Sequence, residues 1–434
     1  AVVGIRDVLL SLVGSEMCIR DRMERIGHFI EVPEADPKEK HMLYLHIPFC
    51  EVLCPFCSFH RVRYREERAL RYYATLRSEI ELAHAAGFRF GEVYIGGGTP
   101  TVNVPELCKT IDLVRRLNPI GQVSIETNPD DLEREELEIL RDAGVNRLSV
   151  GVQSLNDGLL EEMQRRERYG SGAEIRRRLE EARGIFDTLN VDLIFNLPHQ
   201  TLESVRYDID VLTREIEVDQ ISCYPLMGAS STRIAMKKDM GRVGYGRERE
   251  FYEDIRDRLP SDYRASSAWC FSKGTDAIDE YITQYVDYIG LGSGAMSYYR
   301  GTLYAASFSI NRYLRLVEAG HSGITRYSTF SEHDQMRYYF LMKFFGLKVN
   351  KAQAEAHWGG RFHRTLWKDF AAFRLLGAIR DDGENWYLTR KGQYYWVLMM
   401  REFFIAVSNF RDLMRIGIRS ELDPEDREEL SGAA

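Results

Sequence analysis

Three closely spaced cysteines constrain this chain more than any other feature of its sequence. Cys50, Cys54 and Cys57 lie in the string HIPFCEVLCPFCSF with the spacing C-x3-C-x2-C, directly after an apolar run at residues 42–47 that is typical of a β-strand. Three thiolates on one short loop can hold three irons of a [4Fe–4S] cluster and leave the fourth iron open to bind a small molecule. Buried thiols, a disulfide pair and a zinc site are the alternatives. A structural zinc ion takes four ligands, usually in two pairs, and no second pair lies nearby.

A glycine-rich segment follows the next strand-like run. The run EVYI at residues 92–95 leads into Gly96, Gly97, Gly98 and Thr99. Glycines allow a backbone to approach a ligand closely and to present N–H groups to it. We therefore expect this segment to lie beside a bound cofactor.

Strand-like and helix-like segments alternate after the first cysteines. The strand candidates centre on Tyr44, Tyr94, Ile125, Ser149, Leu193 and Ser222. Six β–α units in a row predict an α/β fold with a parallel sheet covered by helices, and the spacing suits a partial barrel. In barrels of this kind the chemistry lies at the carboxyl ends of the strands. The cysteine loop, the glycine segment, Glu126 and Gln153 are predicted to meet there in one cavity.

The character of the chain changes from about Thr329. Helical patterns at residues 336–345 and 362–376 precede a hairpin-like stretch at residues 377–392, which is typical of a winged-helix-like module. Such a module is either a structural cap over the substrate opening or a DNA-binding wing. The net charge of −8 favours the cap and argues against a nucleic-acid partner.

The first 22 residues differ from the rest of the chain and are considered separately from the fold. The string AVVGIRDVLLSLVGSEMCIRDR resembles translated sequencing-adapter read-through, and its apolar run at residues 8–13 is too short for a secretory signal. We expect residues 1–22 to be non-native and Met23 to be the start. The predicted organisation is then a barrel over residues 23–328 and the winged-helix-like cap over residues 329–434.

The longest apolar stretch, residues 394–407, is interrupted by Arg401 and Glu402 and is shorter than the roughly 18 residues of a spanning helix. It is either a buried C-terminal helix or a surface that makes transient contact with a membrane to reach a lipid substrate. Seven cysteines without a regular pairing pattern do not indicate a secreted disulfide framework. We therefore expect a cytoplasmic protein.

The cysteine motif followed by GGGT resembles the radical SAM superfamily. The order of motifs from residue 42 to the C-terminus resembles its oxygen-independent coproporphyrinogen III oxidase-like family. The resemblance implies a partial (β/α)6 radical SAM barrel whose [4Fe–4S] cluster binds S-adenosylmethionine. Reduction then splits this cofactor into methionine and a 5′-deoxyadenosyl radical. The resemblance also implies a small-molecule ring substrate and a reducing electron donor such as flavodoxin or ferredoxin.

The resemblance assigns contacts with S-adenosylmethionine residue by residue. Gly97, Gly98 and Thr99 stand where the family holds the amino group of the cofactor. Tyr44, six residues before the first cysteine, would lie beside the cofactor and take part in catalysis. Glu126 in the string ETNP would bind the nucleoside.

Further contacts are implied later in the chain. Gln153 matches the glutamine of a GVQ string, and Arg165, twelve residues on, would pair with the methionine carboxylate. Asp192 would bind the ribose and Ile194 would touch the adenine. The purely structural alternatives are packing for Tyr44, helix capping for Gln153 and Asp192, and a surface ion pair between Glu126 and Arg165.

Gly292 and Gly294 of the string GLGSGA match a family segment near the substrate or a second S-adenosylmethionine. One or two molecules of this cofactor are therefore expected.

Three functions stay open within the family. True coproporphyrinogen oxidases carry a fourth cysteine where this chain has Phe59. Heme-binding chaperones carry an HN-x-x-YW string where residues 279–285 read DEYITQY. A third branch uses two S-adenosylmethionines to methylate ring carbons of menaquinone and similar molecules, and the strings CSFHR and GLGSGA are compatible with it.

Overall fold

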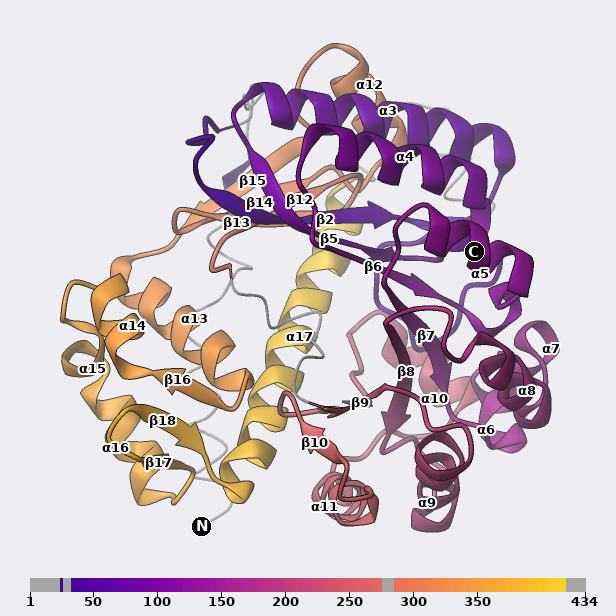
Figure 1. Ribbon diagram of the computed structural model, residues 1–434, viewed down its shortest axis with the longest axis vertical. Coiled ribbons are helices and arrows are strands. Elements are labelled where there is room, and N and C mark those ends of the chain that lie inside the picture. The colour runs from indigo at the N-terminus through magenta and orange to yellow at the C-terminus, as the bar shows by residue number, and fades with distance from the viewer. Residues whose placement is uncertain (1–23, 26–32, 275–284, 419–434) are drawn as a thin grey trace.

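Parallel strands with helices outside them form the larger part of the molecule (Figure 1). The computed structural model describes residues 24–25, 33–274 and 285–418 of the 434-residue chain. The predicted non-native segment, residues 1–22, and the proposed start at Met23 lie outside the described residues. So do residues 279–284, which were compared above with the heme-binding string.

Within the described residues, six consecutive parallel strands form the centre of the main sheet. They are β2 (Lys40–Ile47), β5 (Arg89–Gly97), β6 (Gln122–Thr127), β7 (Arg147–Gln153), β8 (Thr188–Phe195) and β9 (Gln220–Pro225). Each pairs in parallel with the next. Each contains the residue on which the sequence analysis centred a strand, so the predicted β–α alternation is confirmed.

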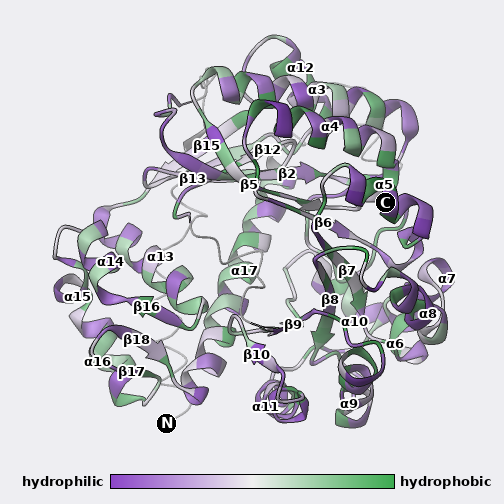
Figure 2. Cartoon of the chain, in the orientation of Figure 1, coloured by the Kyte–Doolittle hydropathy of each residue, from purple (hydrophilic) through white to green (hydrophobic). Residues whose placement is uncertain are grey.

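Helices connect these strands along the outside of the sheet (Figure 1). They are α3 (Glu66–Ala85), α4 (Val104–Leu117), α5 (Arg134–Asp142), α6 (Asp157–Glu162), α7 (Arg166–Tyr169), α8 (Gly172–Ala182) and α9 (Leu202–Asp210), with α10 (Thr232–Asp239) and α11 (Glu248–Arg258) after β9. In Figure 2 they alternate between hydrophobic and hydrophilic colours, as expected for helices with one buried face.

Local sequence explains where these helices begin and end. The Asn103 side chain accepts a hydrogen bond from the Glu106 N–H at 3.1 Å, which caps α4, and Pro105 stands in its first turn. Gly87 follows α3 with φ +98°, a conformation that glycine adopts without strain. The buried side chains of α3 include Leu76 and Ile80, as its apolar spacing predicts.

Shorter strands extend the sheet beyond the predicted units. In order along the chain they are β10 (Tyr263–Ala265), β11 (Cys270–Lys273), β12 (Tyr288–Leu291), β13 (Met296–Tyr299), β14 (Thr302–Ala306) and β15 (Ile324–Thr329), and β1 (Glu24–Arg25) pairs with β15. β12 lies parallel to β2, and β13, β14 and β15 continue from it antiparallel. The described residues thus form a 13-stranded mixed sheet. Helix α12 (Ile310–Glu318) connects β14 with β15.

The C-terminal part has the element order of a winged helix. The elements are α13 (Glu332–Phe345), β16 (Lys348–Asn350), α14 (Lys351–His357), α15 (Phe362–Thr365), α16 (Trp367–Leu375), β17 (Ile379–Asp381) and β18 (Asn385–Leu388). β18 lies between β16 and β17 in a small antiparallel sheet. The predicted winged-helix-like architecture is therefore present.

Helix α17 (Arg390–Ile418) leaves this part and runs across to the main sheet (Figure 1). Trp396, Val397 and Met400 on it are fully or almost fully buried, which agrees with the buried-helix interpretation of this stretch. Arg401 forms a buried ion pair with Glu248 of α11. In the part of the chain that the structure describes, no helix is both long and apolar enough to cross a membrane.

Candidate active site

The cysteine loop begins at the carboxyl end of β2 and is closed at its base by backbone hydrogen bonds. Strand β3 (Phe49–Cys50) pairs with β4 (Val62–Arg63). The Tyr64 N–H donates to the Cys50 carbonyl at 2.8 Å, and inside the loop the Cys57 N–H donates to the Cys54 carbonyl at 3.2 Å. These bonds hold the cysteines close to one another at the end of the sheet.

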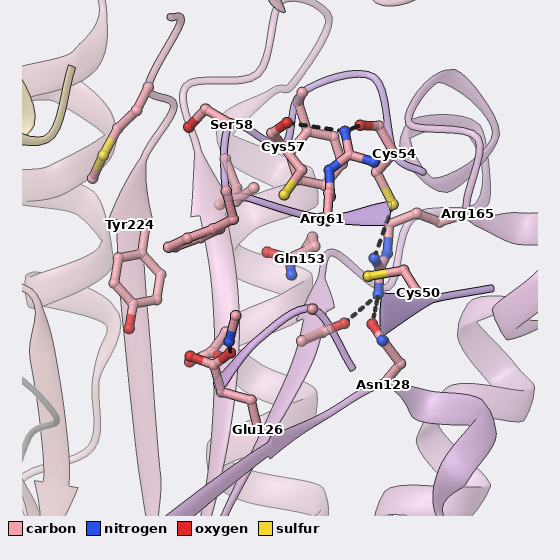
Figure 3. A pocket seen from close by; sticks show the side chains of 18 of the residues that line it. Cys50, Cys54, Cys57, Ser58, Arg61, Glu126, Asn128, Gln153, Arg165 and Tyr224 are labelled. Carbon is pink, nitrogen blue, oxygen red and sulfur yellow. Dashed lines mark hydrogen bonds between the residues drawn. The ribbon is translucent and has the colours of Figure 1, made fainter. Parts of the chain in front are cut away.

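The cysteines line a cavity of about 220 Å³ at the carboxyl ends of the parallel strands. Its lining also includes the predicted site residues Gly97, Gly98, Glu126, Gln153, Arg165, Asp192 and Ile194. Figure 3 shows the cysteines with Arg61 and Arg165 in one part of this pocket, and Glu126 on the opposite side. The structure therefore brings together most of the residues on which the sequence analysis based a cofactor site.

The donor set is three thiols on one loop, and thiolates are the ligands that hold iron–sulfur clusters. In an iron–sulfur cluster each thiolate binds its own iron, so the three sulfurs can surround a group larger than one metal ion.

The backbone at Gly98 leaves no room for a side chain. A Cβ atom on Gly98 would lie 2.5 Å from the Phe49 carbonyl oxygen and 3.0 Å from the Cys50 Sγ.

Burial and neighbouring groups affect the protonation of the thiols in the cysteine loop. Burial and the neighbouring Cys57 raise the pKa of the Cys50 thiol to about 12. Iron binding requires thiolates, so loading of a cluster would release protons. Arg61 donates to the carbonyl oxygens of Cys54 and Cys57, and its buried Nε and Nη1 have no hydrogen-bond partner in the described structure. Its guanidinium group offsets negative charge on the sulfurs.

Arg165 lies against the cysteine loop. Its Nη1 donates to the Cys54 Sγ at 3.4 Å, and its Nη2 donates to the Asn128 Oδ1 at 3.0 Å and to the Gly151 carbonyl. Its Nε has no hydrogen-bond partner among the described residues, and its guanidinium stacks 4.1 Å from the centre of the Tyr169 ring. Arg165 is buried, so the surface ion pair considered above is wrong.

The carboxylates of the pocket are held by neighbouring strands. Glu126 accepts hydrogen bonds from the Tyr94 hydroxyl at 2.7 Å and from the Gly97 N–H at 2.9 Å. Asp192 accepts from the Ser149 hydroxyl at 3.0 Å and from the Asn190 side chain at 2.8 Å. These bonds orient both carboxylates at the strand ends.

Gln153 lies at an irregularity of the sheet. Its φ of +72° is in the left-handed region, which side chains other than glycine seldom adopt. The pairing of β7 with β8 shifts register between Gly151 and Gln153. Strained backbone of this kind is common at ligand sites, although the strain by itself assigns no role.

Four predicted residues, Tyr44, Thr99, Gly292 and Gly294, lie outside the lining of this cavity. Tyr44 lines a second, adjoining cavity. The Thr99 hydroxyl lies 3.7 Å from the Cys50 Sγ and accepts a hydrogen bond from Asn128 at 2.8 Å. Thr99 therefore links the cysteine loop to Asn128. The Gly292 N–H donates to the Glu79 carboxylate at 2.8 Å, away from either cavity.

Gly294 lines the second cavity together with Tyr44. A Cβ atom on Gly294 would lie 2.5 Å from the His60 ring, so the absence of a side chain there matters for packing.

Several residues of the site received no role from the sequence. The additional lining residues include Arg61, Asn128, Tyr169, Tyr224, Trp269, Phe404, Ser408 and Arg411. Arg61 stands in the CSFHR string and could have been found from its proximity to the cysteines. Residues from α17 carry no such signal, because they lie about 350 positions further along the chain.

Helix α17 fastens the cysteine loop from the outside. The Ser58 and Ser408 hydroxyls lie 2.8 Å apart. The Arg415 Nη2 donates to the carbonyl oxygens of Ser58 at 3.0 Å and Phe59 at 2.6 Å. The guanidinium of Arg411 lies 4.9 Å from the centre of the Phe59 ring.

Comparisons with known proteins agree with this geometry. Residues 44–212 match the family model described as the radical SAM superfamily. The heme chaperone HemW of Bacillus subtilis is 28% identical over 375 residues, which cover 81% of this chain and 95% of that protein. The oxygen-independent coproporphyrinogen III oxidase of Salmonella typhimurium is 27% identical over 387 residues, 82% of each chain.

A solved structure shares the fold. The coproporphyrinogen III oxidase HemN from Escherichia coli superposes with a TM-score of 0.70 at 23% identity, over 85% of this chain and 90% of that one. This likeness establishes a common architecture for the strands and helices around the pocket.

Proposed function

The chain belongs to the radical SAM superfamily, in its coproporphyrinogen III oxidase-like family, and on this premise we propose that it is an enzyme acting on a large flat ring. Membership of the superfamily implies a [4Fe–4S] cluster and S-adenosylmethionine. The observation that carries the proposal is the cavity in which Cys50, Cys54 and Cys57 meet Arg165 at the strand ends.

When bound, a reduced cluster supplies the electron that cleaves S-adenosylmethionine. The chain contributes the three thiolates that hold the cluster, and Arg61 holds the loop that carries them. Arg165 presents an unpartnered Nε–H in the described structure, which suits pairing with the methionine carboxylate.

The remaining side chains position the nucleoside half of the cofactor. Glu126 and Asp192 offer carboxylate oxygens as acceptors for hydroxyl groups, and Ile194 offers an apolar contact for the base. Leu226 and Trp269 also line the cavity, and their apolar surfaces would exclude water from the reacting atoms. Tyr44, which lines the adjoining cavity beside Glu126, is proposed to act where cofactor and ring meet.

An anaerobic assay tests the proposal. The reconstituted protein is incubated with a strong reductant, S-adenosylmethionine and either coproporphyrinogen III or a membrane-lipid extract, and mass spectrometry counts the products. 5′-Deoxyadenosine with decarboxylated porphyrinogen supports an oxidase. 5′-Deoxyadenosine together with S-adenosylhomocysteine, formed with the lipid extract, supports a two-cofactor C-methyltransferase. Neither product, with a Soret band on adding heme, would contradict an enzyme and favour a heme-binding chaperone.

Replacing Arg165 with lysine is expected to raise the KM for S-adenosylmethionine about 10- to 100-fold, with iron content unchanged. Lysine keeps the charge but loses the planar fork, and a hydrogen bond to a charged group contributes about 1.5–3 kcal/mol. Steady-state formation of 5′-deoxyadenosine measures the effect. Arg166→Lys is the matched control, because Arg166 is exposed and pairs with Asp157 at 3.5 Å. Equal KM values in the two variants would contradict the role given to Arg165.

A further inference from the structure

Three arginines occupy alternate positions on the strand that closes the cysteine loop. Arg61, Arg63 and Arg65 stand in the string RVRYR, which includes β4. Alternate residues of a strand point to opposite sides, and the residues between the arginines, Val62 and Tyr64, pack against the hydrophobic core. The arginines therefore share the other side of the strand. Arg63 and Arg65 are exposed there, and Arg61 is half-buried.

This strand lies next to the residues that would hold the cluster. In the pairing of β3 with β4, Arg63 stands directly opposite Cys50. Arg61 donates hydrogen bonds to the carbonyl oxygens of Cys54 and Cys57, and Figure 3 shows its side chain between these two cysteines. A molecule that contacts Arg63 from outside would therefore come close to the cysteine loop.

Two of these arginines carry positive charge without an acidic partner. Arg63 and Arg65 form no ion pair in the part of the chain that the structure describes. The acidic pair at residues 66–67 lies in the first turn of α3, where the positive end of the helix dipole favours it. Glu51, the exposed carboxylate of the cysteine loop, pairs with Arg168. The strand thus presents a local positive surface in a chain whose net charge is −8.

Helix α17 adds charge and apolar surface at the next stretch of the loop. Arg415 donates to the carbonyl oxygens of Ser58 and Phe59 and keeps 34% of its side chain exposed. Leu413 and Ile416, one turn apart on the same helix, are 38% and 65% exposed. Arginine beside exposed apolar groups is typical of a surface that contacts another protein.

The position of this surface indicates the kind of partner. Electron transfer slows steeply with distance, so a protein that reduces a cluster must dock against the loop that holds the cluster. Such redox encounters are transient and bury little area, and complementary charge then speeds and orients them. A partner that fits the arginine strand is therefore acidic.

We infer that Arg63 and Arg65, with Arg415 of α17, form the docking surface for an acidic protein that carries a low-potential one-electron group. The inference rests on the proposed function, because it gives the reducing partner of the same site a place on the molecule. One electron passes from the carrier to the cluster, so the carrier is oxidised and the cluster is reduced. No bond forms or breaks between the two proteins. Arg63 and Arg65 attract and orient the carrier through their charge.

Fluorescence anisotropy of a labelled acidic flavodoxin tests the inference without turnover. The reconstituted full-length protein is titrated into the flavodoxin anaerobically, at low and at high salt. We expect Arg63→Glu/Arg65→Glu to weaken binding about 5- to 50-fold at low salt, because each reversal removes an attraction and adds a repulsion. The difference should shrink at high salt, where exposed charges are screened.

Arg116→Glu/Arg264→Glu is the matched control for the change of charge. Arg116, in the last turn of α4, and Arg264 of β10 are also exposed and form no ion pair among the described residues. Neither belongs to the cysteine loop or to α17. We expect this variant to bind the flavodoxin more tightly than Arg63→Glu/Arg65→Glu does.

Cleavage of S-adenosylmethionine is then measured with two reductants. Dithionite is a small molecule that needs no docking surface, so both double variants should form 5′-deoxyadenosine at equal rates and contain equal iron. With sub-saturating reduced flavodoxin, Arg63→Glu/Arg65→Glu should be slower than the control by the factor found for binding.

Two outcomes would overturn the inference. One is equal flavodoxin affinity of the two double variants. The other is self-association of the chain that only Arg63→Glu/Arg65→Glu abolishes, because a second copy would then occupy this surface. Cleavage with dithionite but no flavodoxin binding would defeat the inference and leave the proposed function standing. Flavodoxin binding that depends on Arg63 and Arg65, without cleavage by either reductant, would support the docking surface and defeat the proposed function.

Discussion

Cys54→Ser is expected to abolish cleavage of S-adenosylmethionine, with a loss of more than about 100-fold. Substitutions of groups that merely surround metal ligands already reduce affinity or activity about 10- to 100-fold. A serine hydroxyl is a harder and more weakly ionised ligand than a thiolate, so it is a poor substitute on iron. The change would also remove the sulfur to which the Arg165 Nη1 donates at 3.4 Å. Iron content and 5′-deoxyadenosine formation, measured on the same sample, report the two effects.

Cys108→Ser is the matched control for this experiment. Cys108 is a free, partly buried cysteine on α4, outside the lining of the cysteine pocket. We expect this variant to keep its iron and its activity. Cleavage at the wild-type rate in Cys54→Ser would overturn the assignment of the cluster to this loop.

Arg401→Met is expected to lower the free energy of unfolding by about 3–5 kcal/mol. Arg401 and Glu248 form an ion pair in which both side chains are almost fully buried, and the Tyr245 ring stacks 4.1 Å from the guanidinium. Removing one partner of a buried pair leaves an uncompensated charge, and that loss is of this size. The pair joins α17 to α11, so we expect the change to loosen α17 from the barrel. Urea denaturation followed by circular dichroism measures the loss.

Two further variants test whether the loss of stability comes from the burial of this ion pair. Arg177→Met breaks the exposed pair of Arg177 with Glu181 and should cost no more than about 0.5–1 kcal/mol. The double variant Glu248→Met/Arg401→Met should recover most of the stability, because neither charge is then left buried. If Arg177→Met and Arg401→Met lower the free energy of unfolding equally, the buried pair contributes no more to stability than an exposed pair.

The centre of the fold was predictable because its signals are local. The strands β2, β5 and β8 are apolar runs, and the helices between them repeat apolar residues at helical spacing. The shorter strands outside the six β–α units were missed for the same reason. β12 is four residues long and contains Gly290, so the sequence around it carries no clear strand pattern.

The site was predictable in part. Cys50 and Gly97 stand in short motifs, and the carboxyl ends of parallel strands meet at one edge of a sheet, so their convergence follows from topology. The position of Tyr44 did not follow. Alternate residues of a strand face opposite sides, and Tyr44 shares the inner side of β2 with Met42 and His46 in the second cavity. That cavity also needs Tyr338 of α13, a helix whose placement no motif predicts.

The fastening of the cysteine loop by α17 has a consequence for how the protein is made. The bond from Arg415 to the Ser58 carbonyl joins residues 357 positions apart, among the most distant contacts that a chain of this length can form. Synthesis runs from the N-terminus, so the ribosome has made the cysteines long before it makes the helix that steadies them. Until Ser408 and Arg415 emerge, the cysteine loop lacks their contacts and is held by its own bonds and by residues made earlier, such as Thr99 and Arg165. The finished form of the cysteine loop therefore depends on the last helix described in the chain.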